Sequence, residues 1–424
     1  MKEKIVNLIA DHVEGMTAEE IATFIEIPPK QELGDYAFPC FRLAKTMHKA
    51  PNLIAADIKE AIGDVDFLDK IDVQGAYLNF FVKKDIFVQT MIEAALKDNF
   101  GGSDEGADKV ICIDYSSPNV AKNFHVGHLR TTIIGNSLYK IYSKLGYKVI
   151  RINHLGDWGT QFGKLIVAYK NWGTKEAVEK DGVAELMRLY VKFHEEADKN
   201  PELVDEARAW FSKMEHGDEE ALSIWQWFKD ISLVEYKRTY DLLGMDFDYY
   251  LGESFYRDKC QDVVDQLTNA NLLKESEGAM IVDLSDYDMA PCIVTKKDGS
   301  SIYATRDLAA IFYRKNTYHF TKCLYVTGQE QKLHFKQVFK VVELLGNEWA
   351  KDQLVHIPYG LVSLEGAKLS TRSGNIIYAE DILLEAIAKI KEIINEKNPD
   401  LPDKDETAKK IGVGAVLFND LYNQ

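Results

Sequence analysis

The sequence predicts an α/β protein built around a parallel sheet. A short apolar run at 110–115 (VICIDY) has the composition of a buried strand, and apolar residues at helical spacing follow from Leu129 to Leu145. A second apolar run at 148–153 (KVIRIN) completes a strand–helix–strand unit. Strands joined in this way by a helix lie parallel in one sheet.

The remaining elements follow in chain order around this unit. Upstream, helices are predicted at 57–62 and 87–96 and a strand at 76–82, before a turn-rich linker at 101–109. Downstream, 172–232 is charged and helical, and its aromatic stretch IWQWF is expected to pack a core. Strands at 280–284 and 323–326, a helix at 333–345 and helices in 380–424 complete the chain. There, IGVGAV is expected to pack a helix, because a phosphate loop would need a third glycine and a preceding strand.

Composition limits the class of protein. Hydrophobic residues make up 46% and charged residues 28% of the 424 residues, which describes a globular chain of about three domains. No apolar run reaches the roughly 18 residues of a membrane helix, so we expect a cytoplasmic protein. The five cysteines are never spaced as CxxC, which favours reduced core residues. The 51 basic and 67 acidic residues give a net charge of −16, which argues against a nonspecific nucleic-acid binder but permits a local basic surface.

The stretch HVGH lies where the first predicted strand meets its helix. That junction exposes backbone N–H groups and the positive end of the helix dipole, which suit an anion. Gly127 lets a base or ribose approach the backbone, and the imidazoles of His125 and His128 can donate hydrogen bonds to phosphate oxygens. A metal site would need further ligands, which are missing at a recognisable spacing. For these four residues alone, two incidental capping histidines are an equal alternative.

A second candidate element is GAKLSTRSGN at 366–375. Lys368 and Arg372 flank the hydroxyls of Ser370 and Thr371 in a glycine-bounded stretch typical of a loop. Alone, it is more simply a solvated basic turn. In combination with HVGH across a doubly wound core, it favours two cations that close over a departing pyrophosphate.

These two elements resemble the HIGH and KMSKS signatures of class I aminoacyl-tRNA synthetases, with Val126 for isoleucine and Arg372 for the last lysine. The stretches YSSPNVAKNFHVGHLR, HLGDWGTQFG, YATRDLAA and KLSTRSGN together resemble the arginyl-tRNA synthetases, as does the N-terminal KQELGDYAFPCFRLAK. The likeness runs through essentially the whole chain. It implies a Rossmann-type parallel-sheet catalytic core with helical insertions, a small α/β N-terminal domain and C-terminal helices.

The resemblance also implies a division of the chain. Residues 1–105 would form a module that contacts the outer corner of the tRNA, and 109–378 a catalytic domain with insertions at 172–232 and 259–300. Residues 379–424 would begin a helical anticodon-binding domain. Because the family continues further, we expect anticodon recognition to be missing and activity to be impaired in a chain that ends at Gln424.

The implied activity is ATP-dependent ligation of L-arginine to tRNA(Arg). It passes through an arginyl-adenylate, which is transferred to the 2′-hydroxyl of the terminal adenosine, and the first step needs bound tRNA. ATP enters with Mg²⁺ as a substrate metal. The resemblance implies neither a protein-bound structural metal nor a membrane, and a monomer is expected.

The resemblance assigns roles to matching residues. Those assigned to catalysis are His125, Gly127, His128, Lys368 and Arg372. Those assigned to ATP binding are Asn119, Val120, Ala121, Lys122, Asn123, Phe124, Val126, Leu369, Ser370 and Thr371. Those assigned to arginine binding are Asp114, Ser116, Asn119, Tyr303, Asp307 and Gln331.

Side-chain chemistry fits the arginine assignment. Tyr303 and Asp307 are four apart, so on a helix they share a face, and a carboxylate suits a planar guanidinium. Taken alone, Asp307 is equally well a helix-start acid and Tyr303 a core aromatic. The stretch GDWGTQ at 156–161 is balanced between a structural turn and direct substrate contact.

Two other functions remain open at this stage. A small-molecule nucleotidyltransferase shares the HxGH turn, but it would not explain the N-terminal module or the HLGDWGTQFG stretch. A binding-only relative could use the same fold to hold tRNA. Intact HVGH and KLSTR elements and the Tyr303/Asp307 pair argue against it, because a protein without catalysis has no need of all three.

Overall fold

The computed structural model describes residues 1–13, 15–296, 302–360, 363–364, 367–368 and 377–422. The chain divides into two compact units, unit 1 at Met1–Gly101 and unit 2 at Gly102–Gln424. Each unit is built around its own buried apolar cluster or clusters. In the sequence, the division falls at the start of the glycine-rich linker.

Unit 1 is a small antiparallel sheet with helices. Its elements are α1 (Lys2–Ala10), α2 (Ala18–Phe24), β1 (Tyr36–Pro39), α3 (Ala44–Met47), α4 (Pro51–Ile62), β2 (Leu68–Gln74), β3 (Tyr77–Val82) and α5 (Lys84–Ala95). The strands pair in the order β1-β3-β2. Helix α4 packs on β2 and on β3, whose Leu78 and Phe80 are fully buried, and α1 packs on α2 and α4. The helix predicted at 57–62 is the second half of α4, and the strand at 76–82 is β3.

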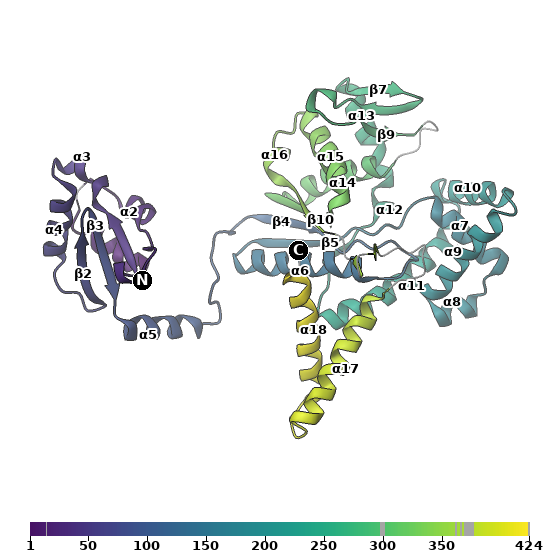
Figure 1. Cartoon of the computed structure of the whole chain (residues 1–424). Coiled ribbons are helices and arrows are strands. Elements are labelled where there is room, and N and C mark those ends of the chain that lie inside the picture. Colours follow the sequence, from purple (N-terminus) through teal and green to yellow (C-terminus); the bar gives the residue numbers. More distant parts are fainter. Residues whose placement is uncertain (14, 297–301, 361–362, 365–366, 369–376, 423–424) are drawn as a thin grey trace. The chain divides into compact units, whose positions relative to one another are not determined.

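Unit 2 is centred on a five-stranded parallel sheet in the order β11-β10-β4-β5-β6. Its strands β4, β5 and β10 are labelled in Figure 1. Its strands are β4 (Val110–Asp114), β5 (Lys148–Asn153), β6 (Tyr249–Tyr250), β10 (Lys322–Gly328) and β11 (Leu354–Tyr359). From β4 the chain moves to β5 and β6 on one side, and later to β10 and β11 on the other. The order therefore reverses between β4 and β10, and ligands of open α/β sheets bind at the carboxyl ends of strands at such a point.

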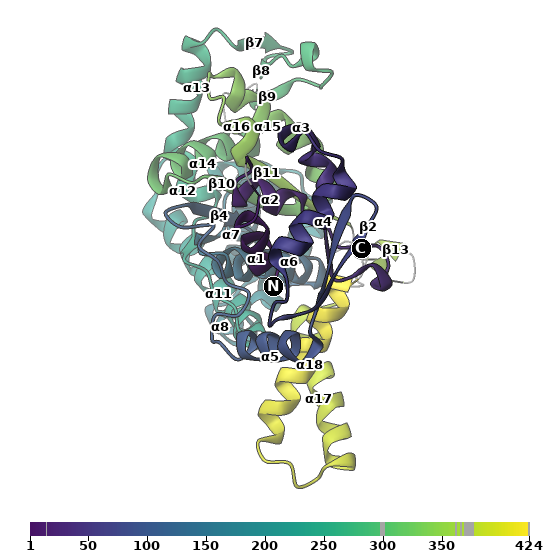
Figure 2. The same ribbon diagram turned by 90° about the vertical axis from the view of Figure 1, so that its left-hand side faces the viewer.

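Helices and two small sheets complete unit 2. The helices are α6 (Val126–Lys144), α7 (Thr160–Trp172), α8 (Lys175–Asp181), α9 (Val183–Ala197), α10 (Glu202–Glu215), α11 (Glu219–Leu243), α12 (Glu253–Tyr256), α13 (Cys260–Asn269), α14 (Tyr303–Tyr318), α15 (Lys332–Leu344), α16 (Ala350–Gln353), α17 (Ala379–Lys397) and α18 (Lys404–Tyr422). The remaining strands are β7 (Leu273–Ser276), β8 (Ala279–Val282), β9 (Cys292–Thr295), β12 (Ser363–Leu364) and β13 (Ala367–Lys368). Helices α7 to α11 gather in one cluster, and α17 and α18 run side by side in both views (Figures 1 and 2).

The central strand β4 has an apolar sequence because both of its faces are buried. Ile111 and Ile113 belong to one buried cluster and Cys112 to another, so both faces of the strand are covered. Helix α6 packs closely on this strand, because a side chain at Gly135 would lie 2.2 Å from the ring of Tyr115. A glycine inside the helix therefore allows it to approach the sheet.

Several predictions of single elements are confirmed. The first unit appears as β4, α6 and β5, with α6 beginning three residues earlier than its periodicity indicated. Trp225 and Phe228 of IWQWF are buried in α11, and Gly412 of IGVGAV packs in α18 against the backbone of Ile387. All five cysteines are free and buried. The described helices include none long and apolar enough to cross a membrane.

Candidate active site

The predicted site residues outside the 366–375 loop lie near the carboxyl ends of β4, β5 and β10. Helix α6 begins at this edge of the sheet, so its N-terminal N–H groups face the point where the strand order reverses. The HVGH stretch forms the first turn of α6. It thus has the position that the sequence predicted for an anion site.

The side chains of His125 and His128 each accept a hydrogen bond from a backbone N–H of this turn. The Nδ1 atom of His125 accepts the N–H of Gly127 at 3.1 Å, and the Nδ1 atom of His128 accepts the N–H of His125 at 3.3 Å. The two rings stack with their centroids 3.9 Å apart. Because each Nδ1 accepts, the neutral ring carries its proton on Nε2. Both histidines therefore cap the helix, which was one of the two alternatives for HVGH. Capping uses only Nδ1 of each ring, so it is compatible with the other alternative, in which the Nε2–H groups donate to phosphate.

Both imidazoles are held neutral. Burial lowers the pKa of His125, and it lowers the pKa of His128 well below its ordinary value, with the neighbouring His125 adding to the effect. The turn also requires Gly127, since a Cβ there would lie 2.9 Å from Cε1 of His125. The turn thus presents two uncharged donors at a helix N-terminus.

The segment after the downstream element is bound to HVGH. The N–H of Val126 donates to the carbonyl of Ile377 at 3.2 Å, and the N–H of Ala379 donates to the carbonyl of Phe124 at 3.0 Å. The Asn123 amide also lies 3.2 Å from the hydroxyl of Tyr378. One end of the predicted cationic loop is therefore fixed beside the predicted phosphate site.

The loop itself is described only in part. Lys368 lies in the backbone of strand β13, which pairs with β12. The predicted residues Leu369, Ser370, Thr371 and Arg372 lie outside the described residues.

Residues 115–124, between β4 and α6, carry backbone strain. Ser116, Ser117 and Ala121 have φ values of 71°, 45° and 60°, a region that costs energy for residues with side chains. Ser116 is almost fully buried, and its hydroxyl lies 2.7 Å from both the Tyr240 hydroxyl and the Thr132 hydroxyl. This segment is held in a conformation that the local sequence alone would not favour.

Helix α11 supplies much of the support for this loop. Ser232 accepts the N–H of Ala121 at 3.0 Å, and the Tyr236 hydroxyl lies 2.7 Å from the carbonyls of both Asn119 and Lys122. Val120 is buried in the cluster that α11 shares with α7. A helix about 100 residues downstream therefore positions the predicted ATP-binding residues.

The stretch after β5 binds the same loop. Asn119 and Gly156 form a parallel bridge, and the N–H of Val120 donates to the carbonyl of Gly156 at 3.1 Å. A Cβ at Gly156 would lie 2.1 Å from Oδ1 of Asn119, so glycine is required there. This contact gives the first part of HLGDWGTQFG a clear structural purpose.

Asp157 in the same stretch is also structural in its contacts. Its fully buried carboxylate accepts hydrogen bonds from Lys229 at 2.6 Å and from the N–H and hydroxyl of Ser254 at 2.8 and 2.7 Å. Trp225 donates its indole N–H to the Asp157 carbonyl at 2.7 Å. Of the two interpretations of GDWGTQ, these contacts support the structural turn for Asp157.

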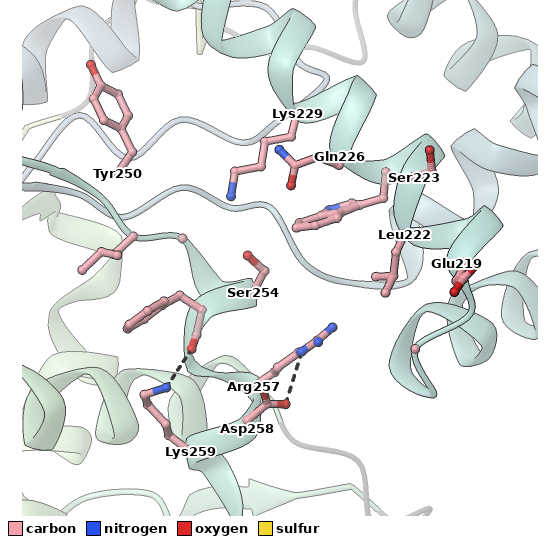
Figure 3. Close-up of a pocket in the computed structure, with 15 residues that line it drawn as sticks. Glu219, Leu222, Ser223, Gln226, Lys229, Tyr250, Ser254, Arg257, Asp258 and Lys259 are labelled. Atoms are coloured by element: carbon pink, nitrogen blue, oxygen red, sulfur yellow. Dashed lines mark hydrogen bonds and ion pairs between the residues drawn. The ribbon is translucent and has the colours of Figure 1, made fainter.

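A cavity of about 730 Å³ lies beside these residues, between α11 and the Tyr250–Lys259 segment (Figure 3). None of the predicted site residues line it. Of the cations that line it, Lys229 is paired with Asp157 and Arg257 with Asp258, and Lys259 donates a hydrogen bond to the carbonyl of Phe255. A second cavity of about 590 Å³ is lined by Gln161, Tyr303 and Arg306 among others. We regard this second cavity as the one connected with the site, because it includes a predicted arginine-binding residue.

Asp114 ends strand β4 and is already ion-paired. Its Oδ2 lies 2.8 Å from Nη2 of Arg314, and its Oδ1 accepts the hydroxyl of Ser117 at 2.9 Å. Arg314 lies on α14 and is fully buried. Its Nε and Nη1 atoms find no hydrogen-bond partner among the described residues.

The predicted guanidinium residues lie together at the start of α14. Asp307 accepts a hydrogen bond from Nε2 of His334 at 2.6 Å, and the ring of Tyr303 packs 4.6 Å from the His334 ring. Burial alone would raise the pKa of Asp307, but the His334 hydrogen bond and nearby positive groups lower it overall. Gln331 is exposed at the end of the 3₁₀ turn after β10. The site thus contains an ionised carboxylate and an aromatic ring, both of which contact His334.

Arg314 and His334 were not among the predicted site residues. Arg314 follows Asp307 by seven residues, about two helical turns, so the spacing already places both on one face of α14. His334 lies in the first turn of α15, the helix after β10, which brings it to the same edge of the sheet as Asp307. A search for charged residues on the faces of predicted core elements would have found both. Within the described residues, no group of three or more His, Cys, Asp or Glu side chains could hold a metal ion.

Comparison with known proteins agrees with this arrangement. Residues 90–424 match the family described as tRNA synthetases class I (R), catalytic domain, and residues 2–82 match the arginyl tRNA synthetase N terminal domain. The chain therefore belongs to the class I aminoacyl-tRNA synthetases, as the parallel sheet and the HVGH turn at its switch point indicated.

Its relatives define the family more narrowly. The chain is 56% identical over 424 residues to the arginine–tRNA ligase of Alkaliphilus metalliredigens, covering 100% of this chain and 75% of the relative. It is 57% identical to that of Clostridium perfringens, covering 100% of this chain and 74% of the relative. Within its class, the chain belongs to the arginyl-tRNA synthetase family.

Solved structures show the same fold. The arginyl-tRNA synthetase of Thermus thermophilus aligns with a TM-score of 0.73 at 22% identity, covering 99% of this chain and 75% of that one. The enzyme of Plasmodium falciparum aligns with a TM-score of 0.69 at 22% identity, covering 100% of this chain and 74% of that one. The fold is thus maintained at low sequence identity.

Proposed function

We propose that this chain ligates L-arginine to tRNA(Arg) with ATP, through an arginyl-adenylate. Curated relatives named arginine–tRNA ligase are 51 to 57% identical to it along its length. The observation that carries the proposal is the first turn of α6. It combines two neutral Nε2–H donors with a helix N-terminus, and residues 377–379 that follow the cationic loop are hydrogen-bonded to it.

In the first step, a carboxylate oxygen of arginine attacks the α-phosphorus of ATP. The bond from that phosphorus to the bridging oxygen breaks, and pyrophosphate leaves. His125 and His128 donate hydrogen bonds to the phosphate oxygens, and the loss of one such donor typically raises the barrier by about 3 kcal/mol. Lys368 and Arg372 neutralise the pyrophosphate. Positioning and charge stabilisation suffice for such chemistry, which needs no covalent intermediate on the protein.

The ATP substrate would bind along the loop before α6 and the loop at 366–375. The proposed residues are Asn119, Val120, Ala121, Lys122, Asn123, Phe124, Val126, Leu369, Ser370 and Thr371. ATP brings Mg²⁺ as part of the substrate, and the chain itself would hold no structural metal. The rigid support of residues 119–122 by α11 is consistent with a preformed nucleotide site.

Arginine would lie across the carboxyl ends of β4 and β10. Tyr303 and Asp307 would bind the guanidinium, with Gln331 completing that end. Asp114, Ser116 and Asn119 would serve the amino-acid head. Ser116 is engaged with Tyr240 and Thr132, so its part in this proposal is to shape the strained loop.

In the second step, the 2′-hydroxyl of the terminal adenosine of the tRNA attacks the carbonyl carbon of the adenylate, and AMP leaves. We propose that residues 1–105 contact the tRNA, that 109–378 carry out catalysis, and that 379–424 begin an anticodon-binding domain. The chain would act as a monomer in the cytoplasm.

Arginine-dependent exchange of labelled pyrophosphate into ATP tests this function. It is measured with and without tRNA that carries the arginine anticodon. Exchange only in the presence of tRNA would establish the amino acid and the tRNA dependence together. If arginine neither supports exchange nor protects the chain from thermal unfolding, the results would favour a small-molecule nucleotidyltransferase activity over the proposed ligase activity. Protection without exchange in either tube would favour the binding-only alternative.

A further inference from the structure

His334 occupies a particular place beside the proposed guanidinium site. It lies in the first turn of α15, with only 10% of its side chain exposed. Its Nε2 contacts Oδ2 of Asp307 at 2.6 Å, and its ring packs on Tyr303. One side chain therefore contacts both residues that are proposed to bind the guanidinium, and they lie on a different helix.

The other oxygen of Asp307 has a different environment. Arg314 can only donate, so Nδ1 of His154 accepts from its Nη2 at 3.3 Å, which places the His154 proton on Nε2. That Nε2 faces Oδ1 of Asp307 at 3.8 Å, which is beyond hydrogen-bond distance. Oδ1 can therefore still accept a hydrogen bond from a ligand, whereas Oδ2 already accepts one from His334.

The difference between Oδ1 and Oδ2 determines the direction from which Asp307 can bind a cation. A carboxylate on a helix can rotate about its side-chain bonds, and a planar guanidinium needs an acceptor at a set angle. The bond to His334 removes that rotation. Because His334 occupies only Oδ2, the Oδ1 atom of Asp307 stays available to the substrate guanidinium.

We propose that His334 is a positioning residue for arginine recognition, which orients Asp307 by binding Oδ2 and supports the Tyr303 ring. The inference rests on the proposed function, in which Asp307 and Tyr303 bind the guanidinium. It gives His334 no part in the phosphate chemistry. The expected effect of losing it is on arginine and not on ATP.

The test uses pyrophosphate exchange with tRNA present. His334→Ala should raise the KM for arginine about 10- to 150-fold, the range for a hydrogen bond to a charged group, and should leave the KM for ATP unchanged. His334→Gln should restore most of this loss, because its amide nitrogen can replace Nε2 as the donor. The matched control is His319→Asn at the exposed end of α14, where φ is 51° and asparagine is tolerated.

A second measurement separates positioning from a general structural role. L-citrulline has the shape of arginine but a neutral end group, and its inhibition constant is measured as a competitor. Loss of an oriented carboxylate should weaken arginine more than citrulline in His334→Ala. Equal weakening of both, or a raised ATP KM with a lower melting temperature, would overturn the proposal.

The Asp307→Asn variant separates an error in the proposed arginine pocket from an error in the proposed role of His334. If it leaves the KM for arginine unchanged, the proposed arginine pocket itself is wrong. If it raises this KM while His334→Ala does not, the pocket stands and the role of His334 is refuted. If both raise it and His334→Gln recovers, the positioning role is supported.

Discussion

The buried ion pair between Arg314 and Asp114 allows a quantitative prediction. Only 1% of the Arg314 side chain and 8% of the Asp114 side chain are exposed, and their charged atoms are 2.8 Å apart. At an effective dielectric constant of about 20, that distance corresponds to roughly 6 kcal/mol of attraction before desolvation is subtracted. Removing one partner leaves the other charge buried, which typically costs about 3–5 kcal/mol.

We therefore expect Arg314→Met to lower the free energy of unfolding of unit 2 by about 3–5 kcal/mol. Methionine keeps an apolar stem of similar length, so the loss reflects the charge more than the packing. Asp114→Asn should have a comparable effect. The double variant should lose less than the sum, with a coupling energy of about 1–3 kcal/mol.

Urea unfolding followed by tryptophan fluorescence measures these values. All six tryptophans of the chain lie in unit 2, so the signal reports the unit that contains the pair. The control is Arg208→Met, because the Arg208–Asp205 pair has 69% and 77% of its side chains exposed and should contribute no measurable stability. Additive effects of Arg314→Met and Asp114→Asn, or an equal loss in Arg208→Met, would refute the reasoning.

Three further predictions concern the loop before α6 and its supports. Gly156→Ala should cost about 1–3 kcal/mol in urea unfolding and raise the KM for ATP, because its Cβ would displace Asn119; unchanged values of both would contradict this. Burial lowers the pKa of His128 well below its ordinary 6.5, so the unfolded chain binds a proton that the folded chain does not. The free energy of unfolding should therefore fall as the pH drops below about 6.5, and His128→Asn should flatten that slope in urea titrations. Asp157→Ala should destabilise unit 2 by about 3–5 kcal/mol, because it leaves Lys229 unpaired. The KM for arginine in pyrophosphate exchange should not rise; a rise would instead support direct substrate contact by the GDWGTQ stretch.

Strongly periodic segments could be predicted because local patterning decides them. The run at 110–115 became β4, because an apolar run this short suits a strand that is buried on both faces. The segment after it became α6, because its helical spacing gathers the apolar residues on one face of a helix. Short elements escaped prediction. Strand β6 has two residues, and β7 and β9 are defined by pairing with β8, so their strand character depends on a neighbour.

The sequence by itself determined the class of chemistry. HVGH and KLSTR are specific residue types at specific spacings, and the positions of His125 and His128 in the first turn of α6 follow from the strand–helix junction. The sequence could not predict that both histidines carry their proton on Nε2, because this depends on backbone N–H groups that point at Nδ1 only in the folded turn.

Only the tertiary structure decided which polar groups meet. Ser232, Tyr236 and Tyr240 hold the loop at 115–124 from more than 100 residues away, and Arg314 and His334 reach the site residues from other elements. In the sequence these are ordinary members of helices. Their roles depend on burial, because a charge or hydroxyl removed from water must find a partner, and the fold alone determines which partner is within reach.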